Sequence, residues 1–205
     1  MAALGKKALL DRLSKGELVV SPILSEDQVG GSSVDLRMGT VVLMARAGRL
    51  SHVDPAAYRT PQDHKVIESK KQKHERFDVP FKESFLLHPG SLALVPTLEW
   101  VTIPSNLQGI VTARSSWARE GLNIATATII NPGYRGIVTL ELANFGEIPI
   151  RLYPGLRIAQ IALYELVCLG EQDRDKDPKS QFDLAFEPEA GNIARKDGKF
   201  ISHDS

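Results

Sequence analysis

The stretch of sequence that decides the fold runs from residue 109 to residue 144 and reads GIVTARSSWAREGLNIATATIINPGYRGIVTLELAN. Short apolar runs rich in Val, Ile, Leu and Thr alternate in it with turn-forming residues, above all at Asn131–Gly136, which holds one proline and two glycines. Runs of this length, closed by turns and not by helical segments, are typical of the strands of an all-β barrel or sandwich.

The same pattern continues on both sides of this stretch. Val34–Arg37 and Val41–Ala45 are each predicted to form a strand, and Lys6–Lys15 is predicted to form a short amphipathic helix. Val34–Arg37 alternates apolar and charged residues, so we expect that strand to be half-buried. The sequence therefore predicts one mainly β domain, residues 1–170, with a short N-terminal helix. Its other predicted strands are Leu92–Val95, Trp100–Ile103, Gly109–Ala113, Ile124–Ile130, Ile137–Leu142, Ile148–Leu152 and Arg157–Leu166.

Two segments depart from this pattern. Residues 47–84 contain many charged residues and little periodicity, which predicts a surface excursion between strands with a short helix around Lys65–Arg76. A solvated charged insertion explains this excursion better than a binding patch does. Residues 171–205 are polar and charged, so we expect a C-terminal tail that becomes ordered only against a partner or a ligand.

The composition excludes several classes of protein. Apolar residues make up 42% of the chain and charged residues 24%, which is ordinary for a soluble globular protein. Lys and Arg (25) balance Asp and Glu (25), so the chain lacks the broad positive field that non-specific nucleic-acid or membrane binding needs. We expect no nucleic-acid or membrane partner and, without a signal-peptide pattern, a cytoplasmic protein. The five histidines and the single cysteine lack metal-ligand spacing, so we expect no metal site built from protein side chains.

Two features of the sequence are candidates for chemistry. Arg114–Arg119 places two guanidiniums and two hydroxyls within six residues, a set of donors that can hold phosphate oxygens, although a solvated turn explains it as well. Glu141 is an acid in an otherwise apolar strand. It is either a carboxylate that faces outward from a surface strand or a base held in a cleft.

Five segments of the chain form a pattern together. They are Gly31–Arg37, Arg114–Arg119 with Gly121-Leu122, Asn131–Gly136, Glu141–Asn144 and Pro154–Gln160. In their order and approximate spacing they resemble the dCTP deaminase family, the sister group of the trimeric dUTPases. The resemblance runs from about Leu9 to Leu166, without residues 47–84.

The resemblance implies a fold, an assembly and an activity. The expected fold is the dUTPase-like distorted β-barrel, or β-clip, assembled as a homotrimer with sites between the subunits. The expected reaction is the hydrolytic deamination of dCTP to dUTP and ammonia, without zinc. Mg²⁺ is expected to bind through the nucleotide triphosphate and not through dedicated protein ligands, and the tail is a possible lid over the nucleotide.

The resemblance also implies roles for individual residues. Glu141 would activate the attacking water and return the proton to the leaving amine, while Ser115 and Arg119 would hold the water and the developing tetrahedral centre. Arg114 and Ser116 would reach the triphosphate of a nucleotide bound mainly by a neighbouring subunit. The remaining residues expected to bind the nucleotide are Thr126, Ala127, Asn131, Tyr134, Gln160 and Lys179.

This chain departs from the family pattern in three places. Asn131 stands where the family usually has aspartate, and an amide cannot act as a base, which counts against dUTP hydrolysis by the usual route. The base-reading loop Asn123–Thr128 is a residue shorter and lacks the family's histidine, and the tail lacks the usual Tyr and Gln. A dUTPase-like or bifunctional pyrophosphatase, or a non-catalytic nucleotide-sensing protein, therefore remains open as an alternative.

Overall fold

The computed structural model describes residues 2–45, 52–53, 73–124, 128–167 and 183–188. The prediction of a mainly β fold with a short N-terminal helix is confirmed. The elements are β1 (Ala2–Ala3), α1 (Lys6–Ser14), β2 (Val19–Ser21), the 3-10 helix η1 (Glu26–Gln28), β3 (Ser33–Arg37), β4 (Val41–Ala45), β5 (His74–Asp78), β6 (Phe85–Leu87), β7 (Leu92–Thr102), β8 (Leu107–Ala113), α3 (Ser115–Arg119), β9 (Leu122–Ile124), β10 (Ile129–Ile130), β11 (Arg135–Asn144), β12 (Ile150–Leu152) and β13 (Arg157–Glu165).

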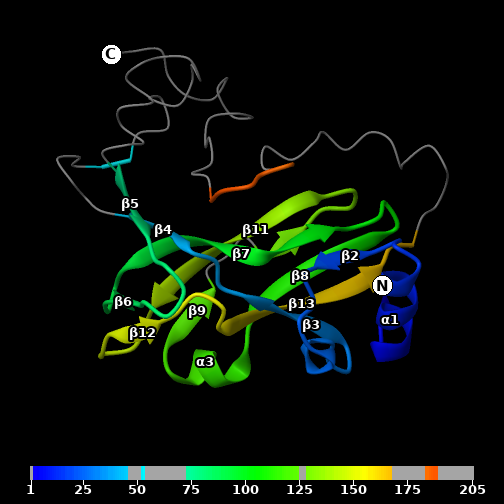
Figure 1. The fold of residues 1–205 in the computed structure, drawn as a ribbon, viewed down its shortest axis with the longest axis horizontal. Helices are drawn as coiled ribbons and strands as arrows, with labels where there is room; N and C mark the ends of the chain where they lie inside the picture. The colour runs from blue at the N-terminus through cyan, green and yellow to red at the C-terminus, as the bar shows by residue number, and fades with distance from the viewer. Residues whose placement is uncertain (1, 46–51, 54–72, 125–127, 168–182, 189–205) are drawn as a thin grey trace, which may run out of the picture.

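The strands form two larger sheets and one two-stranded sheet (Figure 1). In the first sheet β1, β13, β8 and β10 lie in that order, and β3 also pairs with β13. In the second the order is β5, β4, β7, β11 and β9, and β2 also pairs with β7, while β6 and β12 form the third sheet. Neighbouring strands run antiparallel, as expected for a chain whose strands are joined by turns and loops.

One hydrophobic core joins the two larger sheets. Burial of an aliphatic side chain contributes roughly 1.5–3 kcal/mol, so this cluster is the main favourable term that holds the sheets together. Leu9 of α1 is fully buried in the same cluster, which fastens the helix to the sheets. Other members are Val34, Leu36, Val111 and Ile161 from the first sheet and Val95, Val101, Leu140 and Leu142 from the second.

The expectation of a half-buried strand at Val34–Arg37 is wrong, because β3 is buried on both faces. Asp35 is 9% exposed and Arg37 6%. Arg37 can be buried because Glu99 of β7 pairs with it. The Glu99 carboxylate, 0% exposed, accepts hydrogen bonds from Arg37 N at 2.8 Å and from Arg37 Nε at 2.6 Å. Gln28 of η1 donates to the same carboxylate at 3.0 Å. A buried charge is tolerated where it is paired and hydrogen-bonded, as here.

Two predicted strands are in fact one. Leu92–Val95 and all of Trp100–Ile103 except its last residue belong to the single eleven-residue strand β7, which passes through Pro96. The neighbour of β7 changes around this proline, from β4 at Leu94 to β2 at Trp100, and the pairing with β11 shifts register opposite it. A proline is tolerated within a strand at such an irregularity, because the missing N–H breaks no regular ladder.

The end of the charged excursion also differs from the prediction. His74–Asp78 forms strand β5, which pairs with β4, so residues 74–76 are not helical. Residues 65–72 of the expected helix lie outside the described residues. The predicted strand Ile124–Ile130 divides into the ends of β9 and β10, which belong to different sheets.

Six residues of the C-terminal tail, 183–188, lie against the start of β11. Leu184 donates a backbone hydrogen bond to Arg135 O at 2.6 Å, and Ala185 O accepts one from Ile137 N at 3.1 Å. The ring of Phe186 lies 5.0 Å from that of Trp100, measured between centroids. This part of the tail therefore contacts its own chain. No helix among the described residues is long and apolar enough to cross a membrane.

Candidate active site

The predicted phosphate-binding residues lie on α3, a helix of five residues that follows β8. Arg114 precedes the helix in an extended conformation. Two hydrogen bonds fasten this junction to the start of β13, from Arg114 N to Ile158 O at 3.0 Å and from Trp117 Nε1 to Arg157 O at 3.1 Å. The predicted site residues on the exposed surface of α3 are Ser115, Ser116 and Arg119. Their polar groups are thus free to meet a ligand while the backbone beneath them is fixed.

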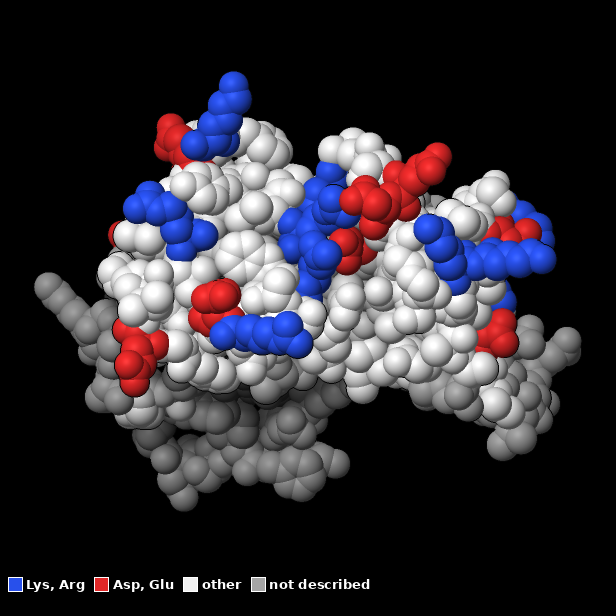
Figure 2. Space-filling view, turned by 90° about the horizontal axis from the view of Figure 1, so that it is seen from below, with Lys and Arg blue, Asp and Glu red and all other residues white. Residues whose placement is uncertain are grey.

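A row of alternating charges runs beside α3. Arg114 Nε lies 3.4 Å from Asp35 Oδ1, and Arg157 Nη1 lies 3.6 Å from the other oxygen of the same carboxylate. Arg157 Nη2 lies 2.8 Å from Asp27 Oδ2, on η1. Figure 2 shows the face that carries α3, with Lys and Arg side chains gathered near its middle, next to a group of acidic ones. One buried carboxylate thus bridges two arginines on a charged surface.

The environment shifts the pKa of both carboxyls, in opposite directions. Burial raises the pKa of Asp35 above its ordinary value, although Arg114 and Arg157 act against that shift. Hydrogen bonds from Ser25 and then from Arg157 lower the pKa of Asp27. The hydrogen bond to Asp27 in turn raises the pKa of Arg157. Asp27 and Arg157 are therefore both ionised at neutral pH.

Gln160 lies on the same face of the first sheet as Asp35. The two residues are backbone partners between β13 and β3, and Gln160 also faces Thr112 on β8. Its amide nitrogen donates to Thr112 Oγ1 at 3.3 Å, and its amide oxygen accepts from Ser33 Oγ at 3.3 Å. Asp35 is thus both the strand partner of Gln160 and the ion-pair partner of Arg114, which brings these two predicted site residues close to one carboxylate.

Glu141 lies on the second sheet, in β11. Its backbone partner on β7 is Leu94, and the next residue, Leu142, pairs with Ile124 of β9. The flanking residues Leu140 and Leu142 are fully buried, whereas Glu141 is half-buried. α3 packs against β9, so β9 stands between the helix and the glutamate strand within one chain. Arg114 and Glu141 are thus held on different sheets.

Asn131 and Tyr134 belong to the turn that opens β11. Tyr134 N donates to Asn131 O at 3.2 Å. The Tyr134 ring is buried, and its hydroxyl donates to the backbone oxygen of Ile137, so it supports the turn. Gly136 has φ +155°, and a Cβ there would lie 3.1 Å from the Tyr134 hydroxyl and 3.2 Å from the backbone of Ala185. The turn and the C-terminal segment meet at this glycine. A nucleotide contact by Tyr134 or Asn131 stays a prediction.

Three of the predicted nucleotide-binding residues, Thr126, Ala127 and Lys179, lie outside the described residues. Within the described ranges, no three His, Cys, Asp or Glu side chains gather in a group that could hold a metal ion.

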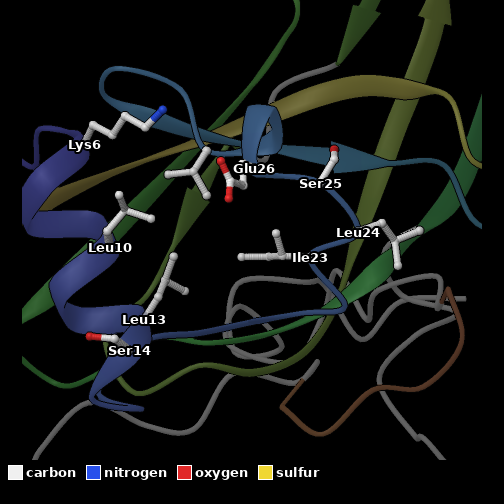
Figure 3. Close-up of a pocket in the computed structure, with 9 residues that line it drawn as sticks. Lys6, Leu10, Leu13, Ser14, Ile23, Leu24, Ser25 and Glu26 are labelled. Carbon is white, nitrogen blue, oxygen red and sulfur yellow. The ribbon is translucent and has the colours of Figure 1, made fainter.

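A separate hollow of about 710 Å³ lies between α1 and the segment before β3 (Figure 3). Leu10 and Leu13 of the helix face Ile23 across it, and Lys6 and Glu26 lie at one side. Its lining is mainly apolar and contains none of the predicted site residues. A triphosphate needs several converging donors, so this hollow does not suit a nucleotide.

The sequence reasoning missed three residues of the charged row. Asp35 and Arg157 lie inside two of the five segments that resemble the family, yet neither was among the predicted site residues. Asp27 lies outside all five segments. A possible signal was the charge of Asp35 and Arg157 at strand positions flanked by apolar residues. The pairing itself joins residues 130 positions apart, which no local pattern reveals.

Comparison with known proteins gives a consistent result. The family model described as dCTP deaminase-like matches residues 3–166. A protein from Halorubrum lacusprofundi named dCTP deaminase is 37% identical over 199 residues, which are 96% of this chain and 93% of the relative. A protein from Methanobrevibacter smithii named "dCTP deaminase, dUMP-forming" is 36% identical over 172 residues, 83% of this chain and 84% of the relative.

A solved structure agrees with this result at the level of the fold. The crystal structure of the 2'-deoxycytidine 5'-triphosphate deaminase from Agrobacterium tumefaciens superimposes with a TM-score of 0.59 at 23% sequence identity. The match covers 84% of this chain but only 49% of the Agrobacterium chain, so this chain spans about half the length of that protein. With a family model that covers most of the sequence and relatives above 30% identity over nearly its whole length, the chain belongs to the dCTP deaminase-like family.

Proposed function

We propose that this protein catalyses the hydrolytic deamination of dCTP to dUTP and ammonia. The observation that carries the proposal is the half-buried Glu141 on β11, in a chain of this family that also keeps Ser115 and Arg119 exposed on α3. Partial burial beside apolar residues suits a general base, because water competes less for its carboxylate. The names of relatives at 36% and 37% identity support the same substrate.

In the proposed reaction Glu141 takes a proton from water, and the resulting hydroxide attacks C4 of the cytosine. Addition to C4 places the negative charge on N3. Glu141 then gives its proton to the exocyclic nitrogen, the bond from C4 to that nitrogen breaks as ammonia leaves, and the remaining hydroxyl proton passes to N3 to give the uracil ring. Water and dCTP enter, and dUTP and ammonia leave, so atoms and charge balance. Ser115 and Arg119 hold the water and the developing tetrahedral centre.

The phosphates are bound by the other half of the predicted site. Arg114 and Ser116 donate to the triphosphate, and Gln160 is the strand partner of Asp35, with which Arg114 pairs. Mg²⁺ fits as a partner of the nucleotide, because the donor set here consists of arginines, serines and an amide that bind phosphate oxygens directly. When bound, the ion neutralises part of the triphosphate charge. The other proposed nucleotide contacts are Thr126, Ala127, Asn131, Tyr134 and Lys179, with the tail as a lid.

A homotrimer completes the proposed site. Arg114 and Glu141 lie on different sheets of one chain, which suits a site that takes them from two subunits. The chain also exposes large apolar side chains, which supports burial against other copies. Those more than two-thirds exposed include Leu24, Phe145, Ile148 and Val167.

A second candidate is a bifunctional enzyme that also cleaves the triphosphate and forms dUMP. The name of the Methanobrevibacter smithii relative favours it. Asn131 opposes it, because an amide cannot take a proton from a second attacking water. We therefore propose dUTP as the product.

The test is to incubate the purified protein with each deoxynucleoside triphosphate and Mg²⁺, to measure ammonia, and to separate the nucleotides by chromatography. We expect ammonia and dUTP in equal amounts from dCTP and no pyrophosphate. Pyrophosphate together with dUMP would establish the bifunctional reaction in its place. Tight binding of dCTP without any ammonia would overturn the enzymatic proposal and leave a nucleotide-sensing protein.

A further inference from the structure

We propose that Arg157 is a second phosphate-binding arginine and that Asp27 is a resting counter-ion which the phosphate displaces. This proposal rests on the proposed function, since it places an additional residue beside Arg114 in the same site. It assigns the charged row next to α3 a role in nucleotide affinity.

Arg157 and Arg114 share one carboxylate, that of Asp35. Asp35 holds Arg114 Nε at 3.4 Å with one oxygen and Arg157 Nη1 at 3.6 Å with the other. Both guanidiniums are thereby kept beside the same buried group, and their side chains remain 38% and 32% exposed. Two partly exposed arginines held side by side are a suitable arrangement for a polyphosphate, which offers oxygens at several adjacent positions.

Arg157 differs from the neighbouring Arg37 in its exposure and its partners. Arg37 is the backbone partner of Arg157 across β3 and β13, so the two arginines come from adjacent strands. The Arg37 side chain is 8% exposed, and it is held by the fully buried Glu99 and by the backbone oxygen of Pro22. Arg37 is thus a structural residue. Arg157 instead has one long contact, to Asp35 at 3.6 Å, and one short contact, to the exposed Asp27 at 2.8 Å.

The exposed acid that pairs with Arg157 is Asp27. The Asp27 side chain is 67% exposed, and such surface pairs are weak and screened by salt. With Asp27 in place, the two arginines and two aspartates of the row are neutral overall. Without it, they carry one positive charge. A triphosphate carries several negative charges and can replace a single exposed carboxylate on Arg157.

The backbone of Arg157 also ties it to the rest of the site. Its carbonyl oxygen accepts the hydrogen bond from Trp117 Nε1 on α3, and the adjacent Ile158 O accepts from Arg114 N. These contacts do not involve the Arg157 side chain, so a substitution there leaves them in place. The effect of the side chain on binding can therefore be separated from a structural effect on α3.

The experiment measures dCTP affinity by calorimetry, in a Glu141→Gln background so that the nucleotide is not consumed. We expect Arg157→Gln to weaken binding roughly 10-fold or more, the usual effect of losing a charge-assisted contact. Asp27→Asn is expected to tighten binding several-fold, because the competing carboxylate is removed. Glu26→Gln is the matched control, since Glu26 is the preceding residue of η1 and the change in charge is the same. It should leave the affinity unchanged.

A double-mutant cycle makes the test specific. If Asp27 acts only through Arg157, the gain from Asp27→Asn should vanish in the Arg157→Gln background. The proposal is overturned if Asp27→Asn leaves affinity unchanged or lowers it, or if Glu26→Gln tightens binding equally. Inorganic tripolyphosphate, titrated into the wild type and the same variants, tests the phosphate-binding role of Arg157 separately from the proposed function. If the protein does not bind dCTP but the variants keep the expected order of affinities for tripolyphosphate, only the proposed function is rejected.

Discussion

Replacement of Glu99 by glutamine should strongly destabilise the fold, although it changes a single heavy atom. The Glu99 carboxylate is fully buried and accepts three hydrogen bonds, two from Arg37 and one from Gln28. An amide keeps the shape but turns one acceptor into a donor that faces other donors. At least one buried donor then lacks a partner, which costs about 1–3 kcal/mol. The Arg37 guanidinium also loses its counter-charge, and breaking a buried pair in this way costs about 3–5 kcal/mol in total.

The assay is urea unfolding followed by tryptophan fluorescence, at one fixed protein concentration because the proposed association of chains would add to the measured stability. Glu165→Gln is the control, since it breaks the pair between Arg12 Nη2 and Glu165 Oε1 at 2.9 Å, in which Glu165 is half exposed. That substitution should cost less than about 1 kcal/mol. If Glu99→Gln costs no more than Glu165→Gln, the reasoning about the buried network is refuted.

Four further predictions concern the site, the assembly and the tail. Glu141→Gln should lower ammonia release from dCTP by roughly 10²–10⁴-fold while calorimetry still detects dCTP binding, and near wild-type turnover would remove Glu141 from its proposed role. Arg114→Ala should weaken dCTP binding by about 1.5–3 kcal/mol, and an unchanged dissociation constant would contradict a phosphate contact. Light scattering should give three times the monomer mass, whereas a stable monomer at micromolar concentration would exclude a shared site. Phe186→Ala and Trp100→Ala should show a coupling of about 0.5–1.5 kcal/mol in unfolding experiments, because the two rings lie 5.0 Å apart, and purely additive effects would argue against that contact.

The sequence predicts most strands because their signals are local. Val41–Ala45, for example, is a strand of the same bounds in the structure. The prediction fails where the decisive partner is distant in the chain. Pro96 reads as a break, yet β7 continues through it because the neighbouring strands change there. Arg37 reads as exposed because the sequence does not show that Glu99 lies beneath it.

The candidate site follows the same rule. The motifs identified residue types that suit phosphate binding and proton transfer, and the structure does place Arg114 and Gln160 beside the same residue, Asp35. The contact between Arg157 and Asp27 depends on the way η1 folds back toward β13. Such a contact is a property of the tertiary structure, so no spacing in the sequence predicts it.

The absence of a side chain at Gly136 affects how the C-terminal segment contacts the sheet. The backbone of the sheet and the backbone of the C-terminal segment approach each other there so closely that a single methyl group would meet both Ala185 and the Tyr134 hydroxyl. Side chains also attach this segment, since Asp183 pairs with Arg135 and Glu187 with Arg76, but the backbone contact at Gly136 depends on the missing Cβ. In a related chain, a side chain at this position would force Ala185 or the Tyr134 hydroxyl to shift by a few tenths of an ångström, so glycine here permits the closest approach of the tail to the sheet.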